Sequence, residues 1–389
     1  MEPENRPRHT EDAGLFRSLN EQLWPESGMT APGETPYSEL PWIFAGPGGL
    51  RAGWCALIFV LLAFVFLFIL GSFSTPLAGA LHLDLGQLSP GVMILQEGVF
   101  LLALVLAALV MTRVERRRLL DYNLIGPRRL AHFASGLAAG FAVLSALVGV
   151  MTWGGSLHFG PRELNGAQIL HYGVLWAFAF LLLGLSEEGS FRGYLQFTLT
   201  RGLNFWWALA TVLFLIVICL AGSSGNGAAG VYVAGLLGLV PCLLLHLRKA
   251  PGSAFWQAAW VTSTLFAFVH IFNSGESWIG ILAAAGIGFV FCVSIRLTGS
   301  AWWAIGCHIS WDWSESYLYG VANSGVTAQG HFLASSPVGN PLWSGGTSGP
   351  EGSLLVLPAI LLLLVLLLLL YGRGRPPKDA VTEPRQPAG

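Results

Sequence analysis

The residues best suited to chemistry stand at the end of an apolar run, residues 174–185. They are two adjacent carboxylates, Glu187 and Glu188, followed by the guanidinium of Arg192. Placing such groups in a membrane helix costs free energy unless each one finds a partner. An ionisable residue in an apolar helix therefore marks a candidate functional site.

Two further polar pairs interrupt apolar segments downstream. Phe266 and His270 are four residues apart, as are His308 and Asp312, so each pair shares one face of a helix. A buried carboxylate beside an imidazole can take a proton from water and later pass one to a leaving amine, while other donors stabilise an oxyanion. The set therefore suits hydrolysis of an amide bond.

A metal ion offers a second route to the same reaction. Glu187, His270 and His308 are a carboxylate and two histidines, a set that can bind zinc with one position left open for water. The usual short His-Glu-x-x-His helix is absent from the sequence. The spacing alone leaves zinc open as a cofactor and does not choose between the two mechanisms.

The two adjacent carboxylates are expected to have different partners. Glu188 lies four residues before Arg192, the favourable order for an ion pair on one helix face. Glu187 is rotated by about 100° from Glu188 around the helix axis, so it projects elsewhere. A histidine from another helix is its expected partner. Glu97, near the outer start of an earlier apolar segment, is expected at the membrane interface.

The elements that must position these residues are membrane helices, each needing about 20 apolar residues to cross a bilayer. With 54% hydrophobic and 11% charged residues, the 389-residue chain is too apolar for an ordinary soluble enzyme. The sequence predicts an all-α, polytopic membrane helical bundle of about ten transmembrane helices. Their approximate ranges are 54–73, 92–112, 130–153, 171–200, 205–220, 231–247, 254–272, 277–295, 300–319 and 354–371.

Basic residues predict the orientation, because loops rich in Lys and Arg tend to stay in the cytoplasm. They gather in the connections after even-numbered segments, whereas the odd connections contain Arg162 alone. Both termini are therefore expected in the cytoplasm. The charge pattern does not resemble a nucleic-acid-binding surface, so no nucleic acid is expected as a partner. All five cysteines lie in apolar runs and are expected to be free and buried.

Three strings in the order found here are similar to the motifs of a known family. They are residues 187–194 (EEGSFRGY), residues 266–270 (FAFVH), and residues 298–302 (TGSAW) leading to His308 and Asp312. Over residues 130–320 the chain resembles the CPBP intramembrane proteases, the CAAX protease and bacteriocin-processing family, also called ABI. Each motif is short, but the order of the three is specific.

The resemblance implies a role for each candidate residue. Glu187 and His270 would activate the attacking water, while His308 and Asp312 would support the oxyanion. The remaining motif residues would be structural or supporting: Glu188, Arg192 and Phe266. Family members are described both as metalloproteases and as metal-independent glutamate proteases, so the resemblance also leaves zinc open.

The resemblance further implies partners and a location. The substrate would be a membrane-associated peptide or protein, the lipid bilayer would surround the enzyme, and the location would be a multi-pass cell membrane, the bacterial inner membrane.

Two features depart from the family pattern. The common residue at position 312 is Asn, whose amide can donate to an oxyanion, whereas an ionised Asp312 would repel it. Asp312 can instead orient the His308 ring, as a carboxylate often does for imidazole. The gap between Arg192 and Phe266 is also longer than usual and predicts an added helical pair near 205–247.

The chain is expected to divide into a core and flanking parts. The predicted parts are a largely disordered cytoplasmic tail (1–50), two transmembrane helices with a basic loop (51–129), the CPBP-like core (130–320), an irregular external loop (321–352), a last, lipid-facing transmembrane helix (353–371) and a cytoplasmic tail (372–389).

Two other functions would use the same residues. A transporter could use Glu187, His270 and His308 as a proton relay, although two similar halves with broken helices would then be expected. A non-catalytic membrane scaffold descended from a protease is the third hypothesis, and Asp312 is the feature that favours it.

Overall fold

The computed structural model describes residues 44–46, 49–222, 227–250, 252–273 and 275–372. The predicted tails, 1–50 and 372–389, lie almost entirely outside these residues. Within them the chain is mostly helical, and its elements follow one another as β1 (Ala45–Gly46), β2 (Gly49–Leu50), α2 (Ala52–Gly71), α3 (Ser74–Ala80), α4 (Pro90–Glu115), η1 (Leu119–Asp121), α5 (Arg129–Trp153), β3 (Leu157–Arg162), α6 (Ala167–Glu188), η2 (Gly189–Leu195), α7 (Gln196–Thr200), α8 (Phe205–Gly222), α9 (Gly227–Leu247), α10 (Ser253–His270), α11 (Trp278–Thr298), α12 (Trp302–Trp313), η3 (Ser314–Leu318), β4 (Leu333–Pro337), α13 (Pro341–Ser344), η4 (Gly346–Ser348), η5 (Pro350–Gly352) and α14 (Val356–Tyr371).

Each of the ten predicted apolar segments coincides with a helix. Six helical stretches of the described chain are long and apolar enough to cross a membrane, which makes this a helical membrane protein. They are Ala52–Ala80, Pro90–Glu115, Arg129–Trp153, Ala167–Thr200, Ala229–Leu247 and Trp278–Thr298. Helices α8 and α14 are apolar but shorter, and α10 and α12 carry polar side chains that lower their hydropathy. The count of ten crossings and the cytoplasmic termini stay predictions.

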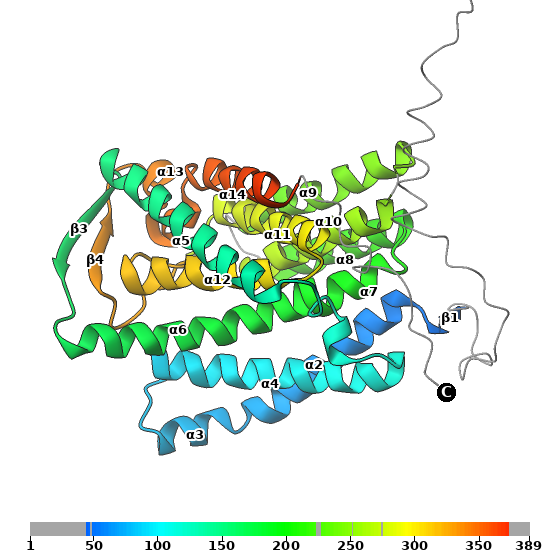
Figure 1. The fold of residues 1–389 in the computed structure, drawn as a ribbon, viewed down its shortest axis with the longest axis horizontal. Helices are drawn as coiled ribbons and strands as arrows, with labels where there is room; N and C mark the ends of the chain where they lie inside the picture. The colour runs from blue at the N-terminus through cyan, green and yellow to red at the C-terminus, as the bar shows by residue number, and fades with distance from the viewer. Residues whose placement is uncertain (1–43, 47–48, 223–226, 251, 274, 373–389) are drawn as a thin grey trace, which may run out of the picture.

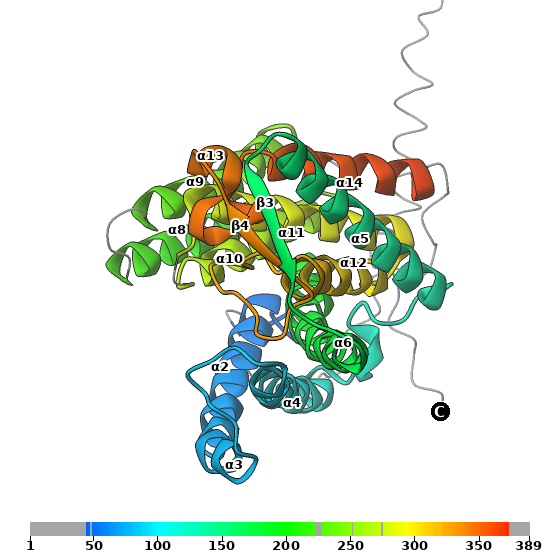
Figure 2. The same cartoon turned by 90° about the vertical axis from the view of Figure 1, so that its left-hand side faces the viewer.

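The helices run broadly along one axis of the molecule, with the β3–β4 pair at one end (Figure 1). Viewed from that end, α2, α3 and α4 group to one side, next to α6, and the other helices lie on the opposite side of the molecule (Figure 2). Helix α6 packs against both α4 and α12, and α2 packs against α7. The first two apolar segments therefore join the bundle through α6 and α7.

Helix α12 is held closely against α5 by glycines. A Cβ atom at Gly136 or Gly140 of α5 would collide with the backbone of α12, at Trp303 and Cys307 respectively. In the same way, a Cβ at Gly306 of α12 would collide with the backbone of α5 at Phe133. Small residues four apart allow membrane helices to approach in this manner. The close crossing fixes the part of α12 that carries His308.

The two helices predicted near 205–247 are present as α8 and α9; that they are an addition to the family pattern stays a prediction. These helices pack on each other and on α10, and α9 also contacts α11. Gly238 of α9 provides the space, because a Cβ there would lie 2.5 Å from Thr264 Oγ1. The pair thus braces the helix that carries Phe266 and His270.

The long loop after α12 is more ordered than its sequence predicts. Strand β4 pairs antiparallel with β3, in the connection between α5 and α6, and the short elements α13, η4 and η5 follow. Alternating hydrophobicity, which would have revealed the strand, is absent from Leu333–Pro337 because the pair is only partly buried. The loop therefore returns to the bundle and brings Glu351, in η5, toward α12.

The last helix is not simply a lipid-facing anchor. One face of α14 packs on α5 and α11, where Leu363 and Leu367 are fully buried, while Leu361 and Leu369 are exposed. The five cysteines are all free and buried, as the sequence predicts.

Candidate active site

The two adjacent carboxylates end helix α6, at the point where the helical geometry changes. Glu187 and Glu188 are its last two residues, and η2, a stretch of π-helix, begins at Gly189 and ends at Leu195. Helix α12 changes in the same way, since the π-helix η3 begins two residues after Asp312. Such wide turns occur mainly at functional sites because they re-aim side chains at a cost in backbone geometry.

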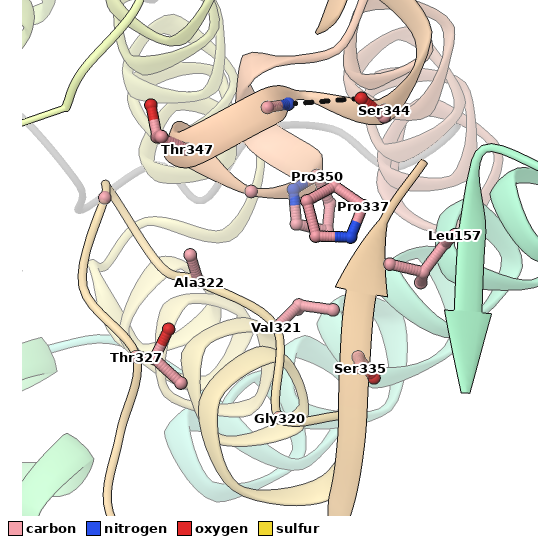
Figure 3. Close-up of a pocket in the computed structure, with 13 residues that line it drawn as sticks. Leu157, Gly320, Val321, Ala322, Thr327, Ser335, Pro337, Ser344, Thr347 and Pro350 are labelled. Carbon is pink, nitrogen blue, oxygen red and sulfur yellow. Dashed lines mark hydrogen bonds between the residues drawn. The ribbon is translucent and has the colours of Figure 1, made fainter. Parts of the chain in front are cut away.

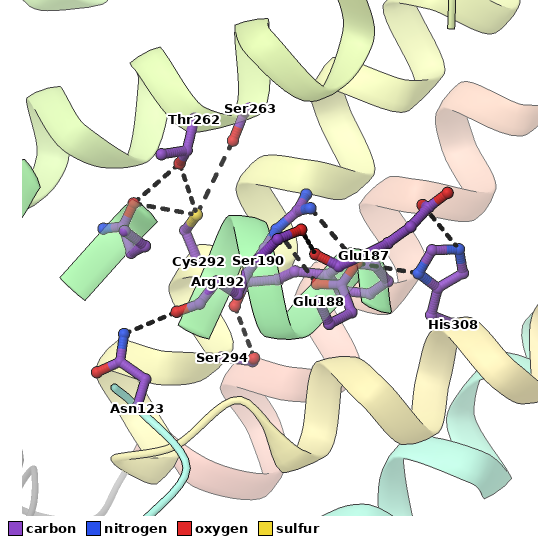
Figure 4. Close-up of polar contacts among 12 residues, drawn as sticks. Asn123, Glu187, Glu188, Ser190, Arg192, Thr262, Ser263, Cys292, Ser294 and His308 are labelled. Carbon is purple, nitrogen blue, oxygen red and sulfur yellow. Dashed lines mark hydrogen bonds and ion pairs between the residues drawn. The ribbon is translucent and has the colours of Figure 1, made fainter. Parts of the chain in front are cut away.

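His308 is the centre of the cluster. Its Nδ1 atom lies 2.9 Å from Glu188 Oε1, and its Nε2 atom lies 3.4 Å from Asp312 Oδ2 and 3.8 Å from Glu187 Oε2. Figure 4 shows the Glu187 and Glu188 side chains reaching the ring from α6. The three carboxylates thus surround one imidazole, with Glu188 on one ring nitrogen and the other two on the second.

Arg192 is the fully buried cation at the inner end of the cluster. Its guanidinium pairs with Glu188, with Nε 3.3 Å from Oε2, and neither side chain is exposed at all. It also lies over the ring of Phe266, 4.3 Å from the centroid, a favourable position for a cation. Gly288 of α11 leaves the space, because a Cβ there would lie 2.5 Å from Arg192 Nη2.

The backbone around Arg192 is fixed from a distant part of the chain. The side-chain amide of Asn123 donates to the carbonyl of Arg192 at 2.8 Å (Figure 4). Behind it, Gln196 accepts a hydrogen bond from Thr262 at 2.9 Å. The first bond ties η2 to the loop after η1, and the second ties α7 to α10; together they hold the Glu188–Arg192 pair in place.

Glu187 and Glu188 differ sharply in accessibility. The Glu188 side chain is completely buried, whereas 23% of the Glu187 side chain is exposed. Glu187 Oε2 is itself enclosed and has no hydrogen-bond partner among the described residues. The rest of the Glu187 side chain is partly exposed, so this carboxylate can meet water at the edge of the cluster, which the completely buried Glu188 cannot.

His270 lies beside this cluster, and among the described residues it forms no hydrogen bond or ion pair with Glu187. Its Nδ1 lies 2.8 Å from the carbonyl of Phe266, one turn earlier, so this nitrogen carries the proton and Nε2 is left as an acceptor. The Phe266 ring contacts both histidine rings, with centroids 4.6 Å from His270 and 6.2 Å from His308. The histidine that Glu187 contacts among the described residues is therefore His308, as expected of a partner from another helix, while the joint role of Glu187 and His270 stays a prediction.

His308 has a second contact that can orient its ring, besides the expected one with Asp312. The side chain on its Nδ1 atom is Glu188, while Asp312 shares the Nε2 side with Glu187. The spacing of His308 and Asp312 predicted a shared helix face correctly. It could not show which ring nitrogen the carboxylate would meet, because that depends on the rotation of the ring.

Asp312 belongs at the same time to a second group of acids. Its carboxylate, that of Glu315 and that of Glu351 each offer an oxygen, and these oxygens all lie within 4.8 Å of one another. Glu351 lies in the loop outside the membrane helices, where burial and the negative charges of Asp312 and Glu276 raise its pKa to about 8. Burial also raises the pKa of Glu276, the acid that precedes α11.

Three acids of this region were not assigned to the site from the sequence. Glu97, expected at the membrane interface, instead accepts a hydrogen bond from Ser186 Oγ at 3.0 Å, next to Glu187. Glu315 had a usable signal, since it stands three residues after Asp312 on the same helix face. Glu351 had none, because its position depends on the return of a long loop.

Comparison with known proteins bears on the same region. The family model for type II CAAX prenyl endopeptidase Rce1-like proteins matches residues 242–314. This stretch includes His270, His308 and Asp312 and lies after Glu187. The resemblance to the CPBP proteases is thereby confirmed. No curated protein and no solved structure matches the chain.

The match supports a membrane enzyme of the CAAX-protease type. Zinc is the metal that the sequence left open as a cofactor, so the geometry of its candidate ligands is compared with a zinc site. Among the described residues, Asp312, Glu315 and Glu351 are the group of three potential ligands that meets a metal-binding distance. Glu187, His270 and His308 do not form such a group, so the described geometry does not fit a zinc ion held by this set.

Proposed function

We propose that this protein is an intramembrane endopeptidase that hydrolyses a peptide bond in a membrane-associated protein or peptide. The observation that carries the proposal is the asymmetry of the two adjacent acids around His308. Glu188 is enclosed with Arg192 and binds one side of the ring, while Glu187, on the other side, has a partly exposed side chain whose inner oxygen, Oε2, makes no hydrogen bond to the described residues. The CAAX-protease type of the matched family agrees with this chemistry.

In the proposed mechanism, Glu187 is the general base. Its carboxylate accepts a proton from the attacking water and then delivers a proton to the leaving amine. The free Nε2 atom of His270 is a second acceptor that can hold and orient that water. Both acceptors are side chains of the protein. The proposed mechanism therefore assigns no step to a metal.

His308 is the proposed electrophilic group. When both ring nitrogens are protonated, Nδ1–H donates to Glu188 and Nε2–H points toward the side of Glu187 and Asp312. A tetrahedral intermediate next to Glu187 would place its oxyanion near this second donor. A fixed cationic donor in a water-poor site stabilises such an anion strongly. Glu188 and Arg192 are supporting residues that hold the ring.

The experiment compares membranes of cells that express the wild type, Glu187→Gln or Glu163→Gln. Glu163 is an exposed acid beside β3 and serves as the matched control. New protein N-termini, identified by mass spectrometry, should be present with the wild type and with Glu163→Gln and absent with Glu187→Gln. The same new N-termini in the Glu187→Gln membranes, at equal expression, would exclude Glu187 as the base.

Metal analysis tests the absence of zinc from the mechanism. Purified, active protein is expected to contain far less than one zinc per chain and to keep its cleavage activity after treatment with a zinc chelator. Stoichiometric zinc together with loss of activity on chelation would assign the chain to the metalloprotease type instead.

The location and orientation are parts of the same proposal. The protein is a membrane protein, and we place it in the bacterial inner membrane with both termini in the cytoplasm, in accord with the distribution of Lys and Arg. A reporter that works only in the cytoplasm should be active when it is fused to either terminus, whereas a reporter that works only on the outer side should be inactive at both.

One observation favours a second candidate, a proton relay. The acids around His308 continue without interruption from Glu187 through Asp312 and Glu315 to Glu351, in the loop outside the helices. A row of titratable groups of this kind can carry protons. Proton uptake into vesicles that depends on Glu315, with no new N-termini in the membranes, would support this function over proteolysis.

A further inference from the structure

The group of three acids beyond His308 has more negative charge than its surroundings balance. Asp312 and Glu315 are buried on one face of α12 and η3, and Glu351 is half-buried in η5. His308, which contacts Asp312, is the nearest positive group that the described contacts provide, and it already faces Glu187 and Glu188. Buried carboxylates without a counter-charge are costly.

Glu315 is the decisive member of this group. Its side chain is completely buried, and neither carboxylate oxygen has a hydrogen-bond partner among the described residues. The indole N–H of Trp311, which also lies near Glu315, donates instead to Glu351 Oε1 at 3.0 Å. An enclosed carboxylate with two unused oxygens, close to two other carboxylates, needs its charge balanced by a cation or a bound proton.

We propose that Asp312, Glu315 and Glu351 bind a divalent cation of the hard, oxygen-preferring class, with Ca²⁺ the best match. All three ligands are carboxylates, which such cations prefer, and no histidine or cysteine belongs to the group of three. Their oxygens all lie within 4.8 Å of one another, so all three can reach one ion. Mg²⁺ usually keeps several waters and binds through one or two carboxylates, whereas Ca²⁺ accepts a flexible set of protein oxygens, so an enclosed group of three carboxylates favours Ca²⁺.

The loop that carries Glu351 is built to bring it to this position. Glu351 Oε2 accepts a hydrogen bond from Ser324 at 3.2 Å, so both of its oxygens are held in place. Gly349, with φ of +86°, lies against the carbonyl of Ala322, where a side chain would collide. Gly349 and Pro350 also line an open pocket of about 500 Å³ (Figure 3), so a cation can reach this loop from outside.

The cation would explain the acid at position 312. An ionised Asp312 beside an oxyanion is unfavourable, but a bound cation would balance its charge and draw its carboxylate toward Glu315. This consequence, unlike the binding itself, rests on the proposed proteolytic function. Binding is therefore measured directly, by a titration whose result does not depend on cleavage.

Calorimetric titration of the full-length protein in detergent with CaCl₂ measures the binding. One Ca²⁺ per chain is expected, together with a rise in the melting temperature. Glu315→Gln and Glu351→Gln should each weaken the affinity by about tenfold or more, because each removes a charged ligand. The control, Glu163→Gln, should bind as the wild type does.

Terbium luminescence locates the ion. Tb³⁺ replaces Ca²⁺ in oxygen sites, and excitation of the nearby Trp311 should sensitise its emission, which added Ca²⁺ should quench by competition. Trp311→Phe should lower this emission while Ca²⁺ still raises the melting temperature. The proposal is overturned if the wild type binds no Ca²⁺, or if Glu315→Gln and Glu351→Gln both bind it with unchanged affinity. Either result would show that bound protons balance these acids.

Discussion

His308 Nδ1 lies 2.9 Å from Glu188 Oε1, and the same carboxylate pairs with Arg192 through its other oxygen, 3.3 Å from Nε. One buried acid therefore joins a permanent cation to the imidazole of the candidate active site. Since Glu188 and Arg192 share helix α6 and its π-helical extension, the ring from α12 is oriented by two side chains of one continuous helical element. The Glu188–Arg192 pair and His308 should behave as one energetic unit.

The first prediction concerns the stability of this unit. Glu188→Gln leaves the enclosed guanidinium of Arg192 without its ionic partner and should destabilise the fold by about 3–5 kcal/mol. Arg192→Met should cost less, because Glu188 keeps His308 as a partner. The double variant should be more stable than the sum of the two losses predicts, since it removes both charges. Unfolding in mixed micelles of increasing SDS content measures the three free energies.

Additive losses would show that Glu188 and Arg192 do not interact in the folded protein. Ser190→Ala, which changes the neighbouring turn and leaves both charges in place, is a matched control and should combine additively with either single variant.

The second prediction separates the two histidines. His270→Ala should lower the cleavage rate by about 10²–10⁴-fold, because it removes an acceptor for the attacking water. It should leave the melting temperature close to that of the wild type, since His270 has no ionic partner among the described residues while His308 has three carboxylates. Rates of appearance of the new N-termini and thermal unfolding of the purified protein supply the two measurements.

Substitution of a histidine outside the site, His331→Ala, should affect neither the rate nor the cluster. Full activity of His270→Ala would assign water activation to Glu187 alone.

The sequence predicted those features that depend on neighbours along the chain. The pairing of Glu188 with Arg192 follows from a spacing of four residues within one helix, and the helices follow from runs of apolar residues. The approach of α6 to α12 was anticipated only as an expected contact of Glu187 with a histidine of another helix. Its detail depends on π-helical turns after Glu188 and Asp312, for which the local sequence has no distinctive pattern.

Features that join distant segments of the chain could not be predicted from the sequence. Glu351 reaches Asp312 because β4 pairs with β3 and returns the long loop, and Leu333–Pro337 has no alternation that would reveal a strand. Glu97 was misplaced because an acid near a helix start is ordinarily interfacial, whereas its partner, Ser186, is on another helix. In both cases a polar group was positioned by tertiary packing alone.

The third prediction concerns pH and the acid in the outer loop. Burial raises the pKa of Glu351 from 4.5 to about 8, so the folded protein holds a proton that the unfolded chain releases. A raised acid pKa stabilises the fold at low pH, and this stabilisation is lost as the pH rises from 4.5 to about 8. In EDTA, the melting temperature should therefore fall over this range, and Glu351→Gln should flatten the fall.

Addition of Ca²⁺ should have the same flattening effect in the wild type, because the cation replaces the proton as counter-charge. Glu163→Gln should keep the full pH dependence. A melting temperature in EDTA that rises over this range, with Glu351→Gln unchanged from the wild type, would contradict the raised pKa.

The fourth prediction uses two glycines on one helix, α11. A Cβ at Gly288 would lie 2.5 Å from Arg192 Nη2 and 3.4 Å from the backbone of Ser263, so Gly288→Ala must displace the guanidinium. A Cβ at Gly286 would meet only the Ile360 side chain, at an ordinary 3.7 Å. Both changes improve helix propensity by about 1 kcal/mol, so a difference between them reports the local environment.

Gly288→Ala should accordingly destabilise the protein by about 1–3 kcal/mol relative to Gly286→Ala, as overpacking of a tight interior does. It should also lower the cleavage rate, because Arg192 holds Glu188 and Glu188 orients His308. The decisive measurement is the combination of Gly288→Ala with Arg192→Met. Since the shorter, neutral side chain relieves the collision, Gly288→Ala should cost less in that background than in the wild type. An equal cost in both backgrounds would mean that Gly288 contributes through its contact with α10 at Ser263 and not through the room it leaves for Arg192.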